Sequence, residues 1–353
     1  MGEQSKQYYG QLDGLRLFAI LIIIASHTSA FGLYGQGSAV VAIFFVLSGF
    51  LVTKPFLSLG EEEFLTVKGW VRYYVLRLAR ILPLYWGLCL MFYWISDQVF
   101  PTRKVLLENL FFLNSTGPLW FLQHEMLNYL VAPFILWMIG VLKKKLHCSN
   151  AWIAVILWIG GILSSLIFFR SAFFVLSWSG EPRQIRLGLF ILGMAVGYTL
   201  KAWKESRNPK WVQEHLLAQG ICDLLLLGLL LGISVFGTEP MLVRFFGESY
   251  EGYYVGWQRP LLCGLMGCGI LFLLVWNGEG AIAKLFRKPL LVKLGQLSYG
   301  VFLIHYFLLE FIVLVPNKRF VLLTALSFGL ARLCYDYVEQ PIYRGVKTLW
   351  KRG

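Results

Sequence analysis

Apolar residues occur along this chain in about ten long runs, separated by short polar or charged connections. Each run is close to the roughly twenty residues that a helix needs to cross a hydrocarbon core about 30 Å thick. The runs begin near Gly14, Ser38, Trp70, Gly117, Ala151, Gln184, Leu216, Trp257, Leu291 and Phe320. The pattern predicts an all-α fold, with one membrane domain over residues 1–353 built from about ten transmembrane helices.

The charges in the connections alternate along the chain. The connection between the first two runs, from Gly32 to Gly37, carries no Lys or Arg. Later connections are basic: they contain Lys143, Lys144 and Lys145, then Lys201, Lys204, Arg207 and Lys210, and then Lys284, Arg287, Lys288 and Lys293. The positive-inside rule therefore places these basic connections and both termini in the cytoplasm, and the protein in the cytoplasmic membrane.

Composition excludes several other classes of protein. The 353 residues are 58% hydrophobic and 14% charged, a balance that a water-soluble domain does not sustain. The net charge of +13 is scattered among apolar runs, so nucleic acid is not an expected partner. The six cysteines show no ligand spacing, so we expect no metal. A cleaved leader ending near Ala30 competes for the first run, but Arg16 interrupts it and nine further runs follow.

The first run contains two ionisable residues, Arg16 and His27. Eleven positions on an α-helix turn through about 1100°, close to three full turns, and rise about 16 Å. The two side chains therefore share one helix face at two depths. Charged groups inside a membrane usually face the bundle interior or an aqueous cavity, so this face is a functional candidate.

Two further ionisable residues are expected near the depth of His27. Counting helix rise from the run ends places Glu125 about 10–12 Å below the outer face and His305 about 20 Å above the inner one. Each alone is more typical of a hydrogen-bonded bundle residue than of a catalyst. Three at one level favour a polar cavity.

Three other motifs each have two interpretations. Ser48 and Gly49 indicate either close helix approach or room for a ligand chain. Arg77 and Arg80 are neighbours on one helix face, suited either to a phosphate group or to lipid headgroups. Glu339, just before Pro341 at the predicted end of the last helix, is either a clamp on these arginines or a ligand contact.

Together these motifs resemble the acyltransferase-3 family of integral membrane acyltransferases, along the whole chain. The matching residues, in order, are Arg16-x10-His27, Phe44-Phe45-x-x-Ser48-Gly49, Arg77-x-x-Arg80 and Glu339-x-Pro341. The stretch from Leu297 to His305 is similar to the family's ninth span. Four motifs at matching spacing are far more specific than any one.

The resemblance implies a ten-helix bundle that passes an acyl group, commonly acetyl, from cytoplasmic acyl-coenzyme A to a hydroxyl, often on an envelope glycan. It implies that His27 is catalytic, that Arg16 supports it, and that Arg77 and Arg80 engage the donor. His124 before Glu125 departs from the family pattern. Several relatives carry a fused extracytoplasmic domain. We expect none here, so either the membrane cavity handles the acceptor or a separate extracytoplasmic partner does.

We therefore predict an acyl-coenzyme A-dependent membrane O-acyltransferase acting on a cell-envelope carbohydrate. Its catalytic group would be His27, Arg16, Glu125 and His305, and its donor-binding group Arg77, Arg80, Ser48 and Glu339. His27 would act as general base or as a transient acyl carrier. The competing class is a transporter or flippase of a small solute or envelope precursor, because buried His, Glu and Arg also build proton relays.

Overall fold

A computed structural model describes residues 8–33, 35–59, 66–96, 99–170, 175–176, 183–184, 186–205, 211–235 and 258–352. Arg207, Lys210 and Trp257, used above for a basic connection and for the eighth run, lie outside these residues.

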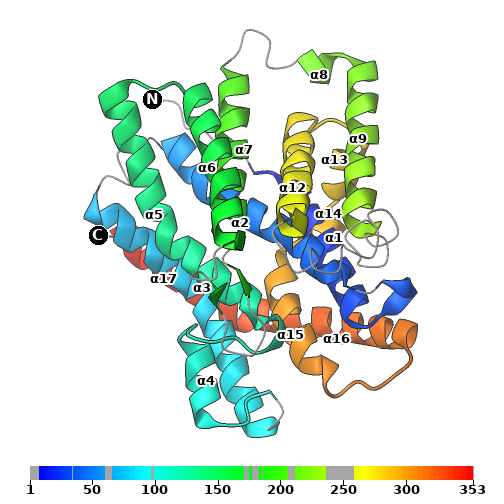
Figure 1. Ribbon diagram of the computed structural model, residues 1–353. Coiled ribbons are helices and arrows are strands. Elements are labelled where there is room, and N and C mark those ends of the chain that lie inside the picture. Colours follow the sequence, from blue (N-terminus) through cyan, green and yellow to red (C-terminus); the bar gives the residue numbers. More distant parts are fainter. Residues whose placement is uncertain are drawn as a thin grey trace.

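Helices make up nearly all of the described chain (Figure 1). The long ones are α1 (Gly10–His27), α2 (Gln36–Leu59), α3 (Val67–Ile95), α5 (Trp120–Leu146), α6 (Asn150–Arg170), α7 (Leu187–Lys204), α9 (Leu216–Val235), α12 (Gln258–Trp276) and α16 (Pro316–Cys334). Shorter ones are η1 (Ala30–Gly32), α4 (Arg103–Leu110), η3 (Gly117–Leu119), α8 (Trp211–Glu214), α13 (Ala281–Phe286), α14 (Pro289–Gln296), α15 (Ser298–Leu309), η6 (Tyr335–Glu339) and α17 (Gln340–Arg352). Two-residue strands, β1 (Val175–Leu176) and β2 (Arg183–Gln184), pair antiparallel.

Seven of the described helices are long and apolar enough to cross a membrane. An eighth span arises if α14 and α15, bent by 59° at the break between them, count as one. The prediction of a helical membrane fold is confirmed. The number ten stays a prediction, although a helix or helix pair lies near the start of each predicted run.

Small residues allow α2 and α7 to pack backbone to backbone. A Cβ added at Gly49 would lie 1.9 Å from the carbonyl oxygen of Phe190, and one added at Gly193 would lie 2.0 Å from that of Val46. Small residues at helix interfaces are the usual means of close approach in membranes. Close helix approach is therefore the role of Gly49 within its motif.

The short helices α13 and α14 hold the first half of α1 in the same way. A Cβ added at Gly14 would lie 2.3 Å from the carbonyl oxygen of Phe286, and one added at Gly295 would lie 1.9 Å from that of Asp13. The position of α1, and with it of Arg16, therefore depends on where α13 and α14 lie.

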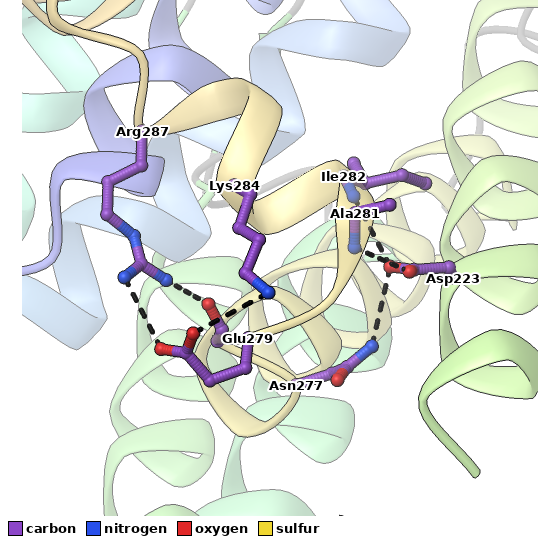
Figure 2. Close-up of polar contacts among 8 residues, drawn as sticks. Asp223, Asn277, Glu279, Ala281, Ile282, Lys284 and Arg287 are labelled. Atoms are coloured by element: carbon purple, nitrogen blue, oxygen red, sulfur yellow. Dashed lines mark hydrogen bonds and ion pairs between the residues drawn. The ribbon is translucent and has the colours of Figure 1, made fainter. Parts of the chain in front are cut away.

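A polar cluster fixes the start of α13 (Figure 2). Asp223 of α9 accepts a 2.7 Å hydrogen bond from the backbone N–H of Ala281, and a 3.4 Å bond from the Asn277 amide. Unpaired N–H groups at a helix start attract such a carboxylate. Glu279 lies between Lys284 and Arg287, at 3.8 and 3.5 Å, so two residues of the predicted basic connection are ion-paired.

The predicted basic connections lie at one end of the bundle: Lys143 lies 5.9 Å from the centre of the Tyr198 ring on α7, and a Cβ added at Gly10 would lie 3.3 Å from Arg287 Cγ. The Lys204 ammonium, at the end of α7, donates a 3.1 Å hydrogen bond to the Tyr9 hydroxyl beside α1. Lys54, near the end of α2, lies 4.6 Å from the centre of the Tyr9 ring. At the opposite end, the Phe31 N–H after α1 donates to Asn317 at the start of α16. This separation agrees with the predicted alternation of connections; their side of the membrane stays a prediction.

One prediction about the last helix is wrong, because Pro341 does not stop it. A π-helical turn, Tyr335–Glu339, is followed directly by α17, which continues to Arg352. The π-turn shifts the hydrogen-bond register, and the Gln340 N–H bonds to the Tyr335 carbonyl. Pro341, which has no N–H, then falls in the first turn of the next helix, where proline is tolerated.

Candidate active site

A cavity opens among α1, α2, α3, α5 and α15. Its polar lining residues come from all five helices and are Arg16, Ser48, Arg77, Arg80, Glu125, Tyr129, Ser298 and Tyr299. Its apolar lining residues are Phe44, Leu51, Ile81, Phe121, Leu122 and Phe302. Five of the eight predicted site residues therefore share one cavity.

Two tyrosines hold Arg77. Its guanidinium carbon lies 4.9 Å from the centre of the Tyr129 ring and 5.7 Å from that of Tyr73. Cation–π contact of this kind restrains the side chain while leaving its N–H groups able to donate. Arg80, one turn on, lines the same cavity and is exposed.

Glu125 is a buried carboxylate at the cavity wall. Its Oε1 accepts a hydrogen bond from the Ser48 hydroxyl, and the Tyr129 hydroxyl donates to Ser48 Oγ at 3.4 Å. Its Oε2 is buried and has no hydrogen-bond partner in the described part of the chain. Ser48 therefore faces the cavity while Gly49 packs on α7, and room for a ligand chain beside Ser48 stays a prediction.

Arg16 lies in the cavity and not beside His27. Its Nη1 donates to Asp13 Oδ1 at 2.7 Å, and the Tyr8 hydroxyl donates to the other oxygen of Asp13. Within the described residues Arg16 makes no contact with His27, as expected for side chains about 16 Å apart along one helix.

His27 and His305 form a hydrogen-bonded pair between α1 and α15. His27 Nδ1 lies 3.0 Å from His305 Nε2, and the rings are inclined by 11° with centroids 5.2 Å apart. His305 is fully buried. The structure thus confirms that these two residues lie at one level, although 278 positions separate them in the chain.

Hydrogen bonding determines which nitrogen of His27 carries a proton. His305 Nδ1 lies 3.0 Å from the carbonyl oxygen of Val301, which only accepts, so Nδ1 carries the hydrogen. In the neutral ring, His305 Nε2 is then an acceptor, and His27 Nδ1 donates to it. His27 Nε2 is left with a free lone pair, the form that a general base requires.

The Nε2 side of His27 faces the start of α2. A Cβ added at Gly37 would lie 3.7 Å from His27 Nε2, so the missing side chain leaves space beside the base. The Gly37 N–H donates to Ser26 Oγ at 3.0 Å and ties α2 to α1 at this point.

Glu125 is not brought to the histidine pair. It makes no contact with either histidine among the described residues. Glu125 bonds to Ser48, which lies on α2 eleven positions after Gly37, the residue beside His27, and this is a helix rise of about 16 Å. The predicted common level therefore holds for the two histidines only. The neighbouring His124 bonds to the Trp120 carbonyl of its own helix.

Glu339 lies outside the cavity lining, against α15. A Cβ added at Gly300 would lie 3.4 Å from Glu339 Oε1, and the carboxylate is close enough to Arg80 for electrostatic attraction. No ion pair joins Glu339 to Arg77 or Arg80 in the described ranges. Both roles considered for Glu339, a clamp on the arginines and a ligand contact, therefore stay predictions.

Sequence reasoning missed several residues of this site. Asp13 could have been found, because it stands three positions before Arg16 on the same helix face. Tyr73 and Tyr129 gave no signal, since aromatic residues are common throughout the chain. The positions of Gly37 and Phe302 beside the histidine pair depend on contacts between helices, which the sequence alone does not indicate.

Comparison with known proteins places this sequence in a family. The model of a family described as an acyltransferase domain matches residues 9–335. Similar curated proteins include "Putative O-acetyltransferase SACOL0978" of Staphylococcus aureus (strain COL), 24% identical over 98% of this chain and 59% of its own length. Another is "Putative peptidoglycan O-acetyltransferase YrhL" of Bacillus subtilis (strain 168), 25% identical over 96% of this chain and 55% of its own.

A third relative is "O-acetyltransferase OatA" of Staphylococcus aureus (strain NCTC 8325 / PS 47), 24% identical over 96% of this chain and 58% of its own length. The chain thus spans little more than half the length of these relatives. No solved structure matches it. Because the family model covers nearly the whole sequence, the chain belongs to the acyltransferase-3 family.

Proposed function

We propose that this protein transfers an acetyl group from cytoplasmic acetyl-coenzyme A to a hydroxyl of a cell-envelope carbohydrate. Family membership and relatives named O-acetyltransferases support O-acyl transfer to an envelope polymer. One relative's name specifies peptidoglycan, which makes a peptidoglycan sugar the first acceptor to test.

One observation supports the proposal most: the arginine-lined cavity and the histidine pair lie at different heights along the same face of α1. Arg16 lines the cavity, and His27 follows eleven positions later on the same face of α1, about 16 Å away. The donor's phosphates would meet Arg77 and Arg80, whose guanidinium groups suit phosphate oxygens. The pantetheine arm would then bring the thioester toward His27.

His27 would act at Nε2. Its lone pair takes the proton from the acceptor hydroxyl, and the oxygen attacks the thioester carbonyl to form a C–O bond. The tetrahedral intermediate collapses, the C–S bond breaks, and the coenzyme A thiolate recovers the proton from His27. The hydrogen bonds to His305 and Val301 hold the ring in the tautomer that this sequence needs.

Acyl transfer by a transient acyl-histidine remains the alternative route within the same proposal. In that route Nε2 attacks the thioester, coenzyme A leaves, and the acceptor hydroxyl then attacks the acyl-imidazole. Both routes use the same free lone pair. Rapid quenching with labelled donor and no acceptor separates them, because only the second leaves label on the protein.

The orientation is part of the proposal, because the donor is cytoplasmic. We propose that the end holding Lys144 faces the cytoplasm and the end holding Lys318 faces outward. In a cysteine-free background, Lys318→Cys should react with an impermeant thiol reagent in intact cells, and Lys144→Cys only after lysis. The opposite pattern would invert the topology and remove the donor site from the cytoplasm.

The function itself is tested with purified protein, labelled acetyl-coenzyme A and a cell-envelope extract. We expect the donor to be consumed and the label to appear on carbohydrate as a base-labile ester. Vesicles that accumulate intact solute without consuming the donor would overturn the proposal in favour of a transporter.

A further inference from the structure

Three phenylalanine rings close the cavity on the side of the histidine pair. Phe44 of α2 and Phe121 of α5 have ring centroids 5.8 Å apart, and Phe121 and Phe302 of α15 lie 5.2 Å apart. The Phe302 ring in turn lies 5.7 Å from the ring of His305. All three line the cavity. The rings thus form a continuous wall that reaches the partner of His27.

The three rings lie at the level between the donor cavity and the base. On α2, Gly37 beside His27 and Ser48 in the cavity are eleven positions apart on one face, with Phe44 between them. On α15, Ser298 lines the cavity and His305 follows seven positions later on the same face, with Phe302 between them. Two helices therefore each place a phenylalanine at the intermediate level.

The rings are supported from behind. Phe121 also packs on Phe45, with centroids 5.0 Å apart, and Phe45 is fully buried. Phe302 is 5% exposed. Close-packed rings leave little room for a longer acyl chain, because inserting carbon atoms among them forces side chains off their preferred rotamers.

We propose that Phe302, with Phe44 and Phe121, determines acyl-chain length, so that the site takes a two-carbon acyl group and rejects longer ones. The inference rests on the proposed function. With the phosphates at the arginines and the carbonyl carbon brought toward His27, the acyl chain lies against these rings. A methyl group fits in ordinary contact with them, whereas each added methylene must displace a ring.

Phe302 is the member to change, because it contacts His305 and contributes no polar atom to the site. Replacing it by alanine removes the ring between cavity and histidine pair and leaves every arginine in place. The test compares acetyl-, butyryl- and octanoyl-coenzyme A as donors for the wild type, Phe302→Ala and Phe302→Leu, with donor affinity and transfer measured separately. Phe272→Ala is the matched control, a partly buried phenylalanine on α12 that packs on Trp276 away from the cavity.

We expect the wild type and Phe272→Ala to prefer acetyl over butyryl donors, and Phe302→Ala to lower that preference by about tenfold or more, since one methylene in a fitted pocket is worth about 10–200-fold. Phe302→Leu should fall between. If Phe302→Ala proves misfolded by size-exclusion chromatography, the donor preferences of Phe302→Leu and Phe121→Leu are compared with the wild type instead.

Acetyl transfer by the wild type with an unchanged chain-length preference in the folded variants would overturn this inference and leave the proposed function standing. Folded wild type that consumes none of the three donors would overturn the proposed function itself. The two failures therefore give different results in one experiment.

Discussion

The cavity and the histidine pair hold polar groups inside the bundle in different ways. In the cavity, two arginines are each restrained by neighbours and still line the open space: Arg77 lies against two tyrosine rings, and Arg16 bonds to Asp13. At the histidine pair, three groups form one hydrogen-bond chain, from His27 through His305 to the Val301 carbonyl.

The difference indicates a division of labour. Open, fixed guanidinium groups suit recognition of a charged donor, which must enter and leave. A buried chain that fixes a tautomer suits proton transfer, where the position of one lone pair decides the rate. Changes in the first region should alter donor affinity, and changes in the second should alter the transfer rate.

The largest effect is expected from His27→Ala. It should lower acyl transfer by about 10²–10⁴, the usual contribution of a positioned general acid or base, and leave donor affinity nearly unchanged. Transfer kinetics and equilibrium donor binding measure the two quantities. His124→Ala is the control, because it removes a buried histidine that does not line the cavity. Transfer near the wild-type rate would contradict the role of His27.

Arg77→Lys should produce the converse result. An ammonium cannot reproduce a bidentate contact with phosphate, so we expect a loss of about 1.5–3 kcal/mol in donor binding. The transfer rate at saturating donor should change little. Arg72→Lys on the same helix, outside the cavity lining, is the control. Unchanged affinity in both Arg77→Lys and Arg80→Lys would mean that these arginines meet lipid only.

His305→Ala should have a smaller effect on transfer than His27→Ala, about 10–10²-fold, because the base remains but loses the acceptor that fixes its tautomer. His305→Gln should recover part of the rate, since its amide oxygen can accept from His27 Nδ1. A loss as large as that of His27→Ala, with no recovery by glutamine, would make His305 a base in its own right.

The smallest effect is expected from Gly37→Ala. The added methyl group lies in ordinary contact, 3.7 Å from His27 Nε2, so the fold should be retained. It narrows the space where the acceptor hydroxyl would approach, and we expect KM for the acceptor to rise by up to about tenfold, with donor affinity unchanged. Gly87→Ala on α3, where no atom lies within 4 Å of the added carbon, is the control. An unaltered acceptor KM would show that the acceptor approaches from another side.

Much of this site follows from local sequence. The shared face of Arg16 and His27 depends only on helical period, and so do the neighbouring positions of Arg77 and Arg80. The family match over residues 9–335 covers three of the four motifs that are visible in the sequence, and Glu339-x-Pro341 lies beyond it. Pro341 shows the limit of local rules. A proline is expected to end a helix, but the π-helical turn before it places Pro341 in the first turn of α17, where no N–H donor is required.

The sequence by itself determined that apolar helices form the protein and which of their faces carry ionisable groups, because period and hydropathy are local properties. Only the tertiary structure decided which of these groups meet. It joined His27 to His305, placed Glu125 with Ser48 and not with the histidines, and put Phe302 between the cavity and the base. These contacts depend on how helices far apart in the chain bend and pack, which small residues such as Gly14 and Gly49 control through the close approaches they permit.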